Sequence, residues 1–374
     1  MRQVLNILNL GIKELRSLSR DPIMMVLILY AFSLGIYVAA TSLPETLHKA
    51  PIAIVDEDQS PLSARIVSAF YPPYFTPPAL IPRDEMDPGL DAGRYTFALN
   101  IPPDFQRDVL AGRQPEVQLN IDATRMSQAF TGGAYIQQIV QGAVAEFVRV
   151  TRASAPPPAD LAIRARFNPT LAQSWFGSVM EIINNVTMLS IVLTGAALIR
   201  EREHGTIEHL LVMPVTPFEI MASKVWAMGL VVLIACAFAL TAMVQGVLRV
   251  PIEGSVPLFL AGAGLHLFAT TSMGIFMGTI ARSMPQFGLL LMLTLLPLQL
   301  LSGGMTPRES MPEIVQTVML AAPTTHFVKM AQAILYRGAG FDVVWPQFLA
   351  IIGIGTVFFA VALARFRKTI STMA

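Results

Sequence analysis

Six long apolar runs alternate with polar stretches along the chain. They cover residues 23–40, 176–199, 222–248, 258–280, 287–304 and 348–365. Each run has about the length of a helix that crosses a bilayer, which needs roughly 20 mostly apolar residues. The pattern therefore predicts an α-helical integral membrane protein with six transmembrane helices, one before and five after a long polar region.

The first 20 residues have a different periodicity from the run that follows them. Apolar residues recur at helical spacing from Arg2 to Arg20, with lysine and arginine between them, which predicts an amphipathic helix on the membrane surface. Asp21 and Pro22 then supply an N-cap and a first-turn proline for the next helix. A signal peptide is the competing interpretation, because residues 38–40 fit a cleavage site. The length of the apolar run favours an uncleaved first transmembrane helix.

Prolines and charges are frequent from residue 43 to about 174, and no segment there is apolar enough to span a membrane. Short apolar or alternating segments predict strands, and segments that begin with a cap and a proline predict helices. The predicted strands cover 51–55, 95–101, 117–121 and 161–167. The predicted helices cover 60–70, 103–110 and 124–150, the last with Gly132-Gly133 as a site of interruption, before a proline-rich linker at 153–159. Strands alternating with helices predict a small α/β domain.

The distribution of lysine and arginine predicts the orientation. Positive charges cluster before the first span, within 200–224, at Arg282 and after the last span, and these four regions share one side of the membrane. Short loops rich in lysine and arginine stay in the cytoplasm. The expected organisation is a cytoplasmic helix plus the first span (1–42), an inserted extracytoplasmic α/β domain (43–174) and a five-helix transmembrane domain (175–374).

One polar segment, residues 200–224, separates two of these spans. Thr206 can cap a short helix with one apolar stripe, and Pro214 is expected to end it. Thr216 to Glu219 then form a capping box that begins the next helix. A short interfacial helix, a break and a new helix predict a cytoplasmic docking surface. The alternative is a solvated hairpin between two membrane helices.

The same segment resembles the signature of ABC-2 type transporter permeases, E-R-E-x-G-T-x-E-x-L followed by P-x-T-x-x-E and a lysine. The matching residues are Glu201, Arg202, Glu203, Gly205, Thr206, Glu208, Leu210, Pro214, Thr216, Glu219 and Lys224. Two positions depart from the pattern, since Met213 replaces a common Ser or Thr and Ser223 replaces a common Gly. The likeness covers the whole chain, including the inserted domain, and is strongest to inner-membrane permeases of Gram-negative bacteria.

This resemblance implies the membrane subunit of an ATP-driven exporter. It implies ABC ATPase subunits as partners and a second permease subunit in a homo- or heterodimer. The inserted extracytoplasmic domain predicts engagement of a periplasmic adaptor or membrane-fusion protein, or a role in handing substrate outward. ATP would be used by the partner ATPase, and this chain would bind no cofactor. It also implies that the residues quoted above couple the two subunits, and that a segment such as Pro323-Thr324-Thr325-His326 lies at the outer mouth of the pathway.

Composition narrows the function further. The chain of 374 residues is 53% hydrophobic and 14% charged, with a net charge of +1, so neither a soluble protein nor a nucleic-acid partner is expected. Its one cysteine, Cys236, lies in an apolar run and cannot form an intramolecular disulfide. The sequence has no phosphate-binding loop, zinc-protease motif or nucleophile elbow, and its five histidines are scattered. No enzyme, catalytic residue or metal site is predicted.

Few polar residues lie within the predicted spans. Those that could line a pathway or bond neighbouring helices are Asn184, Asn185, His266 and Gln299. Bonding between helices is the favoured role. Gly274 and Gly278 predict a small-residue packing face, and Pro297 predicts a kink.

No charged residue is expected deep in a span, which argues against an ion-gradient-driven secondary exporter. A membrane-anchored periplasmic ligand-binding scaffold is the other alternative, and six spans argue against it. Between the fifth and sixth spans, 311–320 and 325–336 predict interfacial or re-entrant helices, with an amphipathic surface loop as the alternative.

Overall fold

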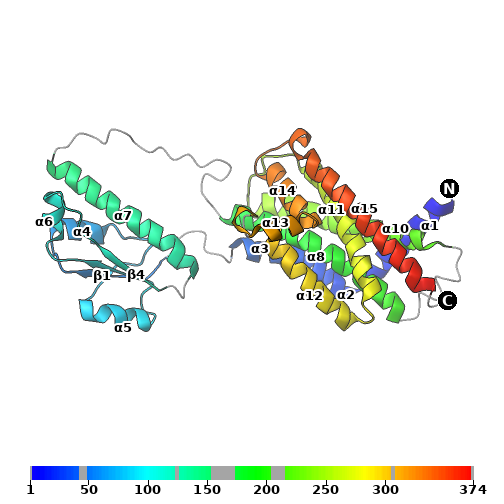
Figure 1. Ribbon diagram of the computed structural model, residues 1–374, viewed down its shortest axis with the longest axis horizontal. Helices are drawn as coiled ribbons and strands as arrows, with labels where there is room; N and C mark the ends of the chain where they lie inside the picture. The colour runs from blue at the N-terminus through cyan, green and yellow to red at the C-terminus, as the bar shows by residue number, and fades with distance from the viewer. Residues whose placement is uncertain are drawn as a thin grey trace. The chain divides into compact units, whose positions relative to one another are not determined.

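The computed structural model describes residues 2–41, 49–122, 126–152, 173–203, 215–304 and 308–371. The chain folds as two compact units. Met1–Leu43 and Gln173–Ala374 form a helical unit, and Pro44–Ala172 form an α/β unit (Figure 1). The residues of the segment 204–214, and with them the predicted interfacial helix, lie outside the described ranges.

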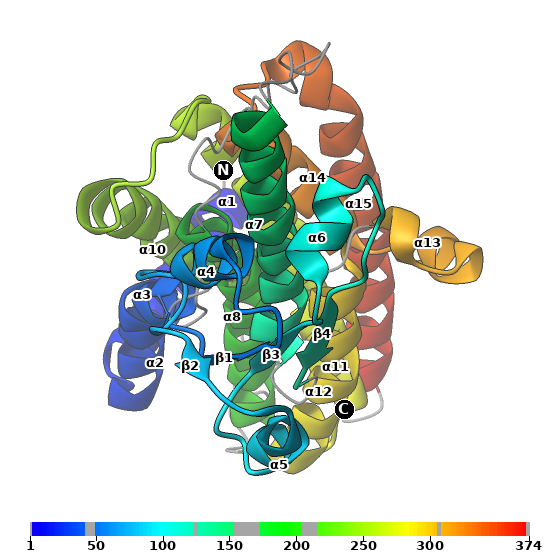
Figure 2. The same cartoon turned by 90° about the vertical axis from the view of Figure 1, so that its left-hand side faces the viewer.

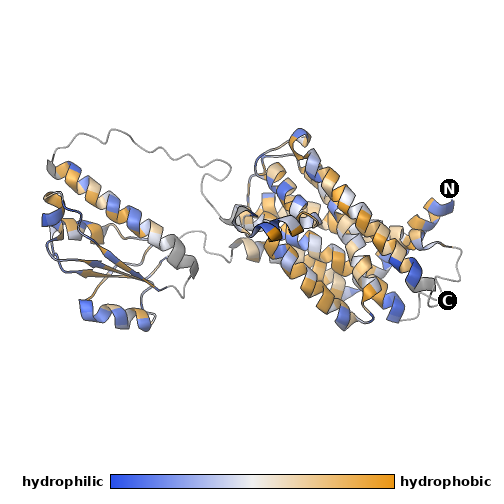
Figure 3. Ribbon diagram, in the orientation of Figure 1, coloured by the Kyte–Doolittle hydropathy of each residue, from blue (hydrophilic) through white to orange (hydrophobic). Residues whose placement is uncertain are grey.

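Apolar helices make up almost all of the helical unit (Figure 3). In chain order they are α1 (Arg2–Ser19), α2 (Pro22–Phe32), α3 (Leu34–Thr41), α8 (Gln173–Glu203), α10 (Pro217–Phe238) with its π-helical continuation η2 (Ala239–Val247), α11 (Val256–Ile280), α12 (Met284–Leu301), α13 (Glu313–Met319), α14 (Pro323–Leu335) and α15 (Phe341–Ser371). By length and composition, six segments within the described ranges can cross a membrane, which confirms the predicted number. They are Pro22–Thr41, Trp175–Glu203, Pro217–Val247, Val256–Ile280, Met284–Leu301 and Phe341–Lys368.

Helices α8 and α11 form the centre of the helical unit. In their most apolar windows, 83% and 67% of the residues are buried, against 17% in α12 and 22% in α15. The two central helices approach closely at glycines, since a Cβ at Gly274 would lie 2.6 Å from the carbonyl oxygen of Ile191. Gly278 likewise faces Gly195 and Leu198 of α8. The predicted small-residue face is therefore the surface on which α11 packs against α8.

The first span is a broken helix rather than the continuous one expected. Its N-cap is Asp21, with Pro22 at the first position, as predicted. The break falls at Ser33, whose backbone N–H donates to the Tyr30 carbonyl and whose hydroxyl donates to the Leu29 carbonyl. The Ala31 carbonyl accepts a hydrogen bond of 2.7 Å from Asn185 Nδ2 of α8. Because a membrane interior offers no water for freed carbonyls, these substitutes are what make the break tolerable.

The connection between α12 and α15 contains two short helices, as the sequence predicts. Ten of the 13 residues of α14 are buried, so this segment is not a surface loop. In contrast, α13 exposes Ile314 and Val318. Pro323, at the start of α14, occupies a first-turn position where its missing N–H costs nothing.

The α/β unit has a four-stranded sheet in the order β2-β1-β3-β4. Its strands are β1 (Ile52–Asp56), β2 (Ala79–Leu80), β3 (Phe97–Ile101) and β4 (Gln118–Ile121), and only β4 runs antiparallel to its neighbour. Helices α4 (Pro61–Ser68), α6 (Phe105–Leu110) and α7 (Met126–Arg152) cover one face, and α5 (Met86–Asp91) covers the other (Figures 1 and 2). β1, β3 and β4 confirm three predicted strands, whereas β2 and α5 were not predicted.

Helix α7 runs through Gly132-Gly133 without the expected interruption. Gly132 is needed for packing, because a Cβ there would lie 2.1 Å from the Phe97 ring. The predicted strand 161–167 and the linker 153–159 lie outside the described residues.

Candidate functional site

The C-terminal end of α8 carries four consecutive charged residues, Arg200 to Glu203. Each of them contacts a different helix: Arg200 pairs with Asp21 before α2, Glu201 with Lys224 inside α10, Arg202 with the end of α11 and Glu203 with the start of α12. We call these four residues and their partners the α8 junction. It joins helix ends that lie far apart in the sequence.

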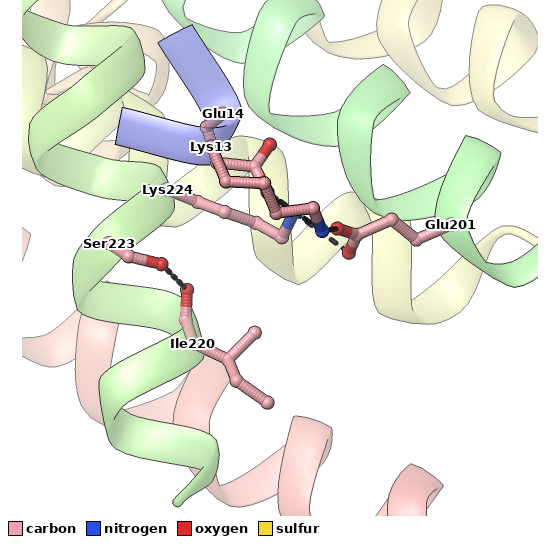
Figure 4. Close-up of polar contacts among 6 residues, drawn as sticks. All are labelled: Lys13, Glu14, Glu201, Ile220, Ser223 and Lys224. Atoms are coloured by element: carbon pink, nitrogen blue, oxygen red, sulfur yellow. Dashed lines mark hydrogen bonds and ion pairs between the residues drawn. The ribbon is translucent and has the colours of Figure 1, made fainter. Parts of the chain in front are cut away.

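The strongest contact of the junction is an ion-pair cluster around Lys224 (Figure 4). Lys224 Nζ lies 2.8 Å from Glu201 Oε2 and 3.0 Å from Glu14 Oε1 of α1. On the outer side of the cluster, Lys13 Nζ lies 3.1 Å from Glu201 Oε1. The cluster thus balances two carboxylates against two ammonium groups and ties α1, α8 and α10 together.

Burial makes the removal of one partner from this cluster costly. Lys224 is 1% exposed and Glu14 is 6% exposed. Burying a charge costs several kcal/mol, which the partner charges offset, so removal of one partner costs about 3–5 kcal/mol. The cluster therefore resists any movement that separates α10 from α8.

Arg200 and Asp21 link the junction to the first span. Asp21 Oδ1 accepts the backbone N–H of Met24 at 3.1 Å, and its other oxygen pairs with Arg200. This cap hydrogen bond, helped by the Arg200 guanidinium, holds the pKa of the Asp21 carboxyl below its ordinary value.

Arg202 and Glu203 hold the turn between α11 and α12. Arg202 Nη1 donates to the Ala281 carbonyl, which follows α11, at 2.7 Å. Glu203 Oε1 accepts the backbone N–H of Met284, the first residue of α12, at 3.1 Å. One side chain thus satisfies a free carbonyl after α11 and the other a free N–H at the start of α12, which helix ends otherwise leave unpaired.

The predicted capping box at the start of α10 is confirmed. Glu219 Oε2 accepts the backbone N–H of Thr216 at 2.6 Å, and the Thr216 hydroxyl accepts the N–H of Glu219. Glu219 also accepts a hydrogen bond of 3.1 Å from Asn6 of α1. Ser223, where the resemblance expects Gly, is buried, and its hydroxyl donates within α10 to Ile220 (Figure 4).

Helix α1 is the part of this site that the sequence did not reveal. Besides Asn6, Lys13 and Glu14, it provides the Ile7 carbonyl that accepts a hydrogen bond from Trp226 Nε1. The Trp226 ring fills the space over Gly11, where a Cβ would lie 2.0 Å from it. A lone glutamate in an otherwise basic helix was the available signal for this role.

The structure assigns different positions to the residues expected to dock a partner. Glu219 and Lys224 are buried, and Glu201, Glu219 and Lys224 all bind side chains of other helices of the helical unit. Arg202 and Glu203 are likewise engaged in the junction. The remaining residues of the pattern that precede α10 are Gly205, Thr206, Glu208, Leu210 and Pro214, and they lie outside the described residues.

Among the polar residues within the spans, two bond neighbouring helices. Asn185 binds Ala31, as described above, and His266 Nε2 lies 2.9 Å from the Thr187 hydroxyl of α8. The buried His266 ring also stacks on Phe327 of α14 at 4.1 Å between centroids. Gln299 is half-buried on α12, and Asn184 lines a cavity beside α8.

The second candidate span also contains one acidic residue near its beginning. Glu181 lies six residues after the start of the second span, which is about 9 Å along the helix. It is half-buried and lines the same cavity as Asn184.

A bundle with six candidate spans and a polar junction at the end of its central helix defines a polytopic membrane protein. A family model described as ABC-2 family transporter protein matches residues 22–364. The chain belongs to this family.

Three relatives have sequences similar to this chain. It is 67% identical to the inner membrane transport permease YhhJ of Escherichia coli (strain K12) over 374 residues, the full length of both. It is 26% identical to the probable multidrug ABC transporter permease YbhR of the same strain over 363 residues, 96% of this chain and 97% of the relative. It is 25% identical to the probable multidrug ABC transporter permease YbhS over 344 residues, 88% of each.

Membership in a transporter family agrees with the absence of enzyme motifs in the sequence. Among the described residues, no group of three or more His, Cys, Asp or Glu side chains could hold a metal ion. Cys236 is buried in α10. The chain is a transport protein rather than an enzyme.

Proposed function

We propose that the chain is the membrane subunit of an ATP-driven exporter in a bacterial inner membrane, energised by a separate ABC ATPase. The α8 junction carries this proposal, because it connects the segment that follows Glu203 to the ends of α2, α10, α11 and α12. A partner that displaces this segment would move these helix ends together. ATP binds to the partner, and this chain needs no cofactor.

In this proposal both termini and residues 200–224 are cytoplasmic, and residues of about 43–174 are periplasmic. The positive-inside rule supports this orientation, since the ends of α1, α8 and α15 nearest these regions are rich in lysine and arginine. The α/β unit would then engage a periplasmic adaptor or membrane-fusion protein. Two copies of the chain, or this chain and a related permease, would enclose the pathway.

Helices α12 and α15 support the pairing of two permease subunits. Large apolar side chains on α12, including Leu289, Met292 and Leu293, are between 67% and 74% exposed within this chain. Such faces are covered by lipid or by another membrane helix. The exposed apolar side chains of α12 could therefore contact lipid or a second permease subunit.

The test is to purify the tagged chain from native membranes in mild detergent and measure the ATPase activity that accompanies it. Vanadate-sensitive ATPase activity is expected with the wild type and with Gly205→Ala, but not with Gly205→Pro, which restricts the backbone and removes its N–H directly before the predicted cap at Thr206. Equal ATPase recovery with both Gly205 variants would refute docking at residues 200–224.

A secondary exporter is the rival that Glu181 supports, because gradient-driven carriers use carboxylates within their spans. The two mechanisms differ in their energy source. Export that continues without ATP and stops when a protonophore collapses the gradient would establish the rival and overturn the ATP-driven proposal.

A further inference from the structure

A cavity of about 560 Å³ lies in the helical unit between the broken first span and α8. Tyr30 and Gly35 line it on one side, and Phe176, Glu181, Asn184 and Asn185 line it on the other. Its other walls are mainly apolar, with leucine, valine and methionine side chains. The volume suits a drug-sized organic molecule.

Glu181 is the charged group of this cavity. None of the ion pairs among the described residues provides it with a lysine or arginine partner. Asn185, one helical turn further along α8, also lines the cavity, and its Nδ2 donates to the Ala31 carbonyl at the break in the first span. A carboxylate within a span is costly and by default marks a functional site.

We propose that this cavity binds lipophilic organic cations and that Glu181 is their counter-ion. The proposal deepens the proposed function by naming the substrate class, and it rests on that function for export but not for binding. The cation replaces the missing basic partner of Glu181, and its apolar body fills the remaining volume.

The lining explains why this class fits better than others. Tyr30 and Phe176 offer aromatic faces, which attract organic cations. Metal ions such as Ca²⁺ need six to eight oxygen ligands, whereas the cavity supplies a single carboxylate and two amides. Anions would meet the Glu181 charge in a poorly solvated space, where repulsion is strong.

The ammonium headgroup of a lipid offers the same charge to Glu181 as a free organic cation does. The experiment therefore includes probes that distinguish the two sources.

The experiment measures the binding of tetraphenylphosphonium to the full-length protein in nanodiscs of phosphatidylglycerol, which has no ammonium headgroup. Tetraphenylborate, an anion of the same shape, is the matched probe. The variants are Glu181→Gln, which removes the charge and keeps the shape, and Ala39→Leu, which reduces the cavity volume. Glu313→Gln is the control carboxylate, since Glu313 is exposed at the start of α13 and does not line this cavity.

Tetraphenylphosphonium should bind the wild type and Glu313→Gln equally. Glu181→Gln should reduce the affinity about tenfold or more, as expected when a charge pair is lost. Ala39→Leu should also weaken binding, and tetraphenylborate should not bind the wild type. Equal affinity of wild type and Glu181→Gln for the cation would overturn the proposal. So would displacement of the cation by phosphatidylethanolamine, which would assign the site to a lipid headgroup.

Binding needs no ATPase, so its outcome is independent of the energy source. If the cation binds through Glu181 but vesicles export it without ATP, the substrate class stands and the ATP-driven function fails. If ATPase co-purifies but Glu181→Gln does not affect cation binding, the function stands and this inference fails.

Discussion

Replacement of Lys224 by methionine tests whether the ion-pair cluster holds the helical unit together. Methionine nearly preserves the length of the side chain and removes the charge. Lys13, whose Nζ is 3.8 Å from Glu14 and whose side chain is 50% exposed, would then remain beside the two carboxylates. The variant leaves buried carboxylates without their main partner.

The expected loss follows from burial. Breaking a buried pair costs about 3–5 kcal/mol, whereas an exposed pair contributes about 1 kcal/mol or less. For a unit of about this size, 1 kcal/mol corresponds to roughly 2–4 °C in the midpoint of thermal unfolding. Lys224→Met should therefore lower the midpoint by roughly 6–20 °C, and Lys13→Met by less than about 4 °C.

Both variants remove one lysine beside Glu201, but Lys224 is buried and Lys13 is half-exposed. Their comparison therefore shows how the burial of the lysine affects the loss of stability. The assay is thermal unfolding of the purified full-length protein in one detergent at one heating rate, because membrane proteins commonly unfold irreversibly. The double variant Glu201→Gln with Lys224→Met removes a positive and a negative charge together. It should be more stable than Lys224→Met alone, since it buries one uncompensated charge fewer.

Equal shifts for Lys13→Met and Lys224→Met would refute this reasoning, because they would show that burial does not decide the cost. A double variant less stable than Lys224→Met would refute it independently.

Three further predictions concern other contacts of the helical unit. Asp21→Asn should keep the N-cap of α2 and lose the pair with Arg200. The pKa of Asp21 is lower in the folded protein than its ordinary value of about 4. Its contribution to folding stability is therefore present above about pH 4 and is lost as the pH falls through the lowered value. In thermal unfolding scans between about pH 5 and 3, Asp21→Asn should lose less stability than the wild type. Gly274→Leu should prevent close packing of α11 on α8 and reduce the yield of monodisperse protein in size-exclusion chromatography. Gly353→Leu is the control, because a Cβ at Gly353 meets nothing within 4 Å. Equal yields of the two variants would contradict the packing argument. Glu203→Gln should retain an acceptor for the Met284 N–H and keep the stability of the wild type. Glu203→Ala removes the acceptor and should lower the stability by about 1 kcal/mol in the same unfolding assay. Identical unfolding midpoints of the two variants would show that this contact contributes nothing.

Local patterns predicted the helices well, because each signal is contained in a few neighbouring residues. The capping box at Thr216 and Glu219, the cap at Asp21 and the six apolar runs are of this kind. Strand β2 was missed because two residues are too few to show a period. The break at Ser33 was missed because its stability depends on Asn185, far away in the sequence.

The candidate site was only partly predictable for the same reason. The sequence identified Glu201 and Lys224 but assigned them to a surface, since charged residues next to a span are normally solvated. Lys224 and Glu14 are 210 positions apart, and no local pattern indicates that they pair. Glu181 is not among the predicted site residues, because a single acid hardly changes the apolar character of its run.

The arrangement of the α8 junction has a mechanical consequence. Successive residues of an α-helix project about 100° apart, so the four side chains from Arg200 to Glu203 surround the helix axis almost completely. A sideways force on this end of α8 therefore stretches one contact while it compresses the opposite one. Such balanced tethering permits tilting about the junction and opposes sliding of single helices. The helix ends held by the α8 junction should consequently move together as one rigid body. Changes in helix spacing should then occur at the opposite ends of the helices.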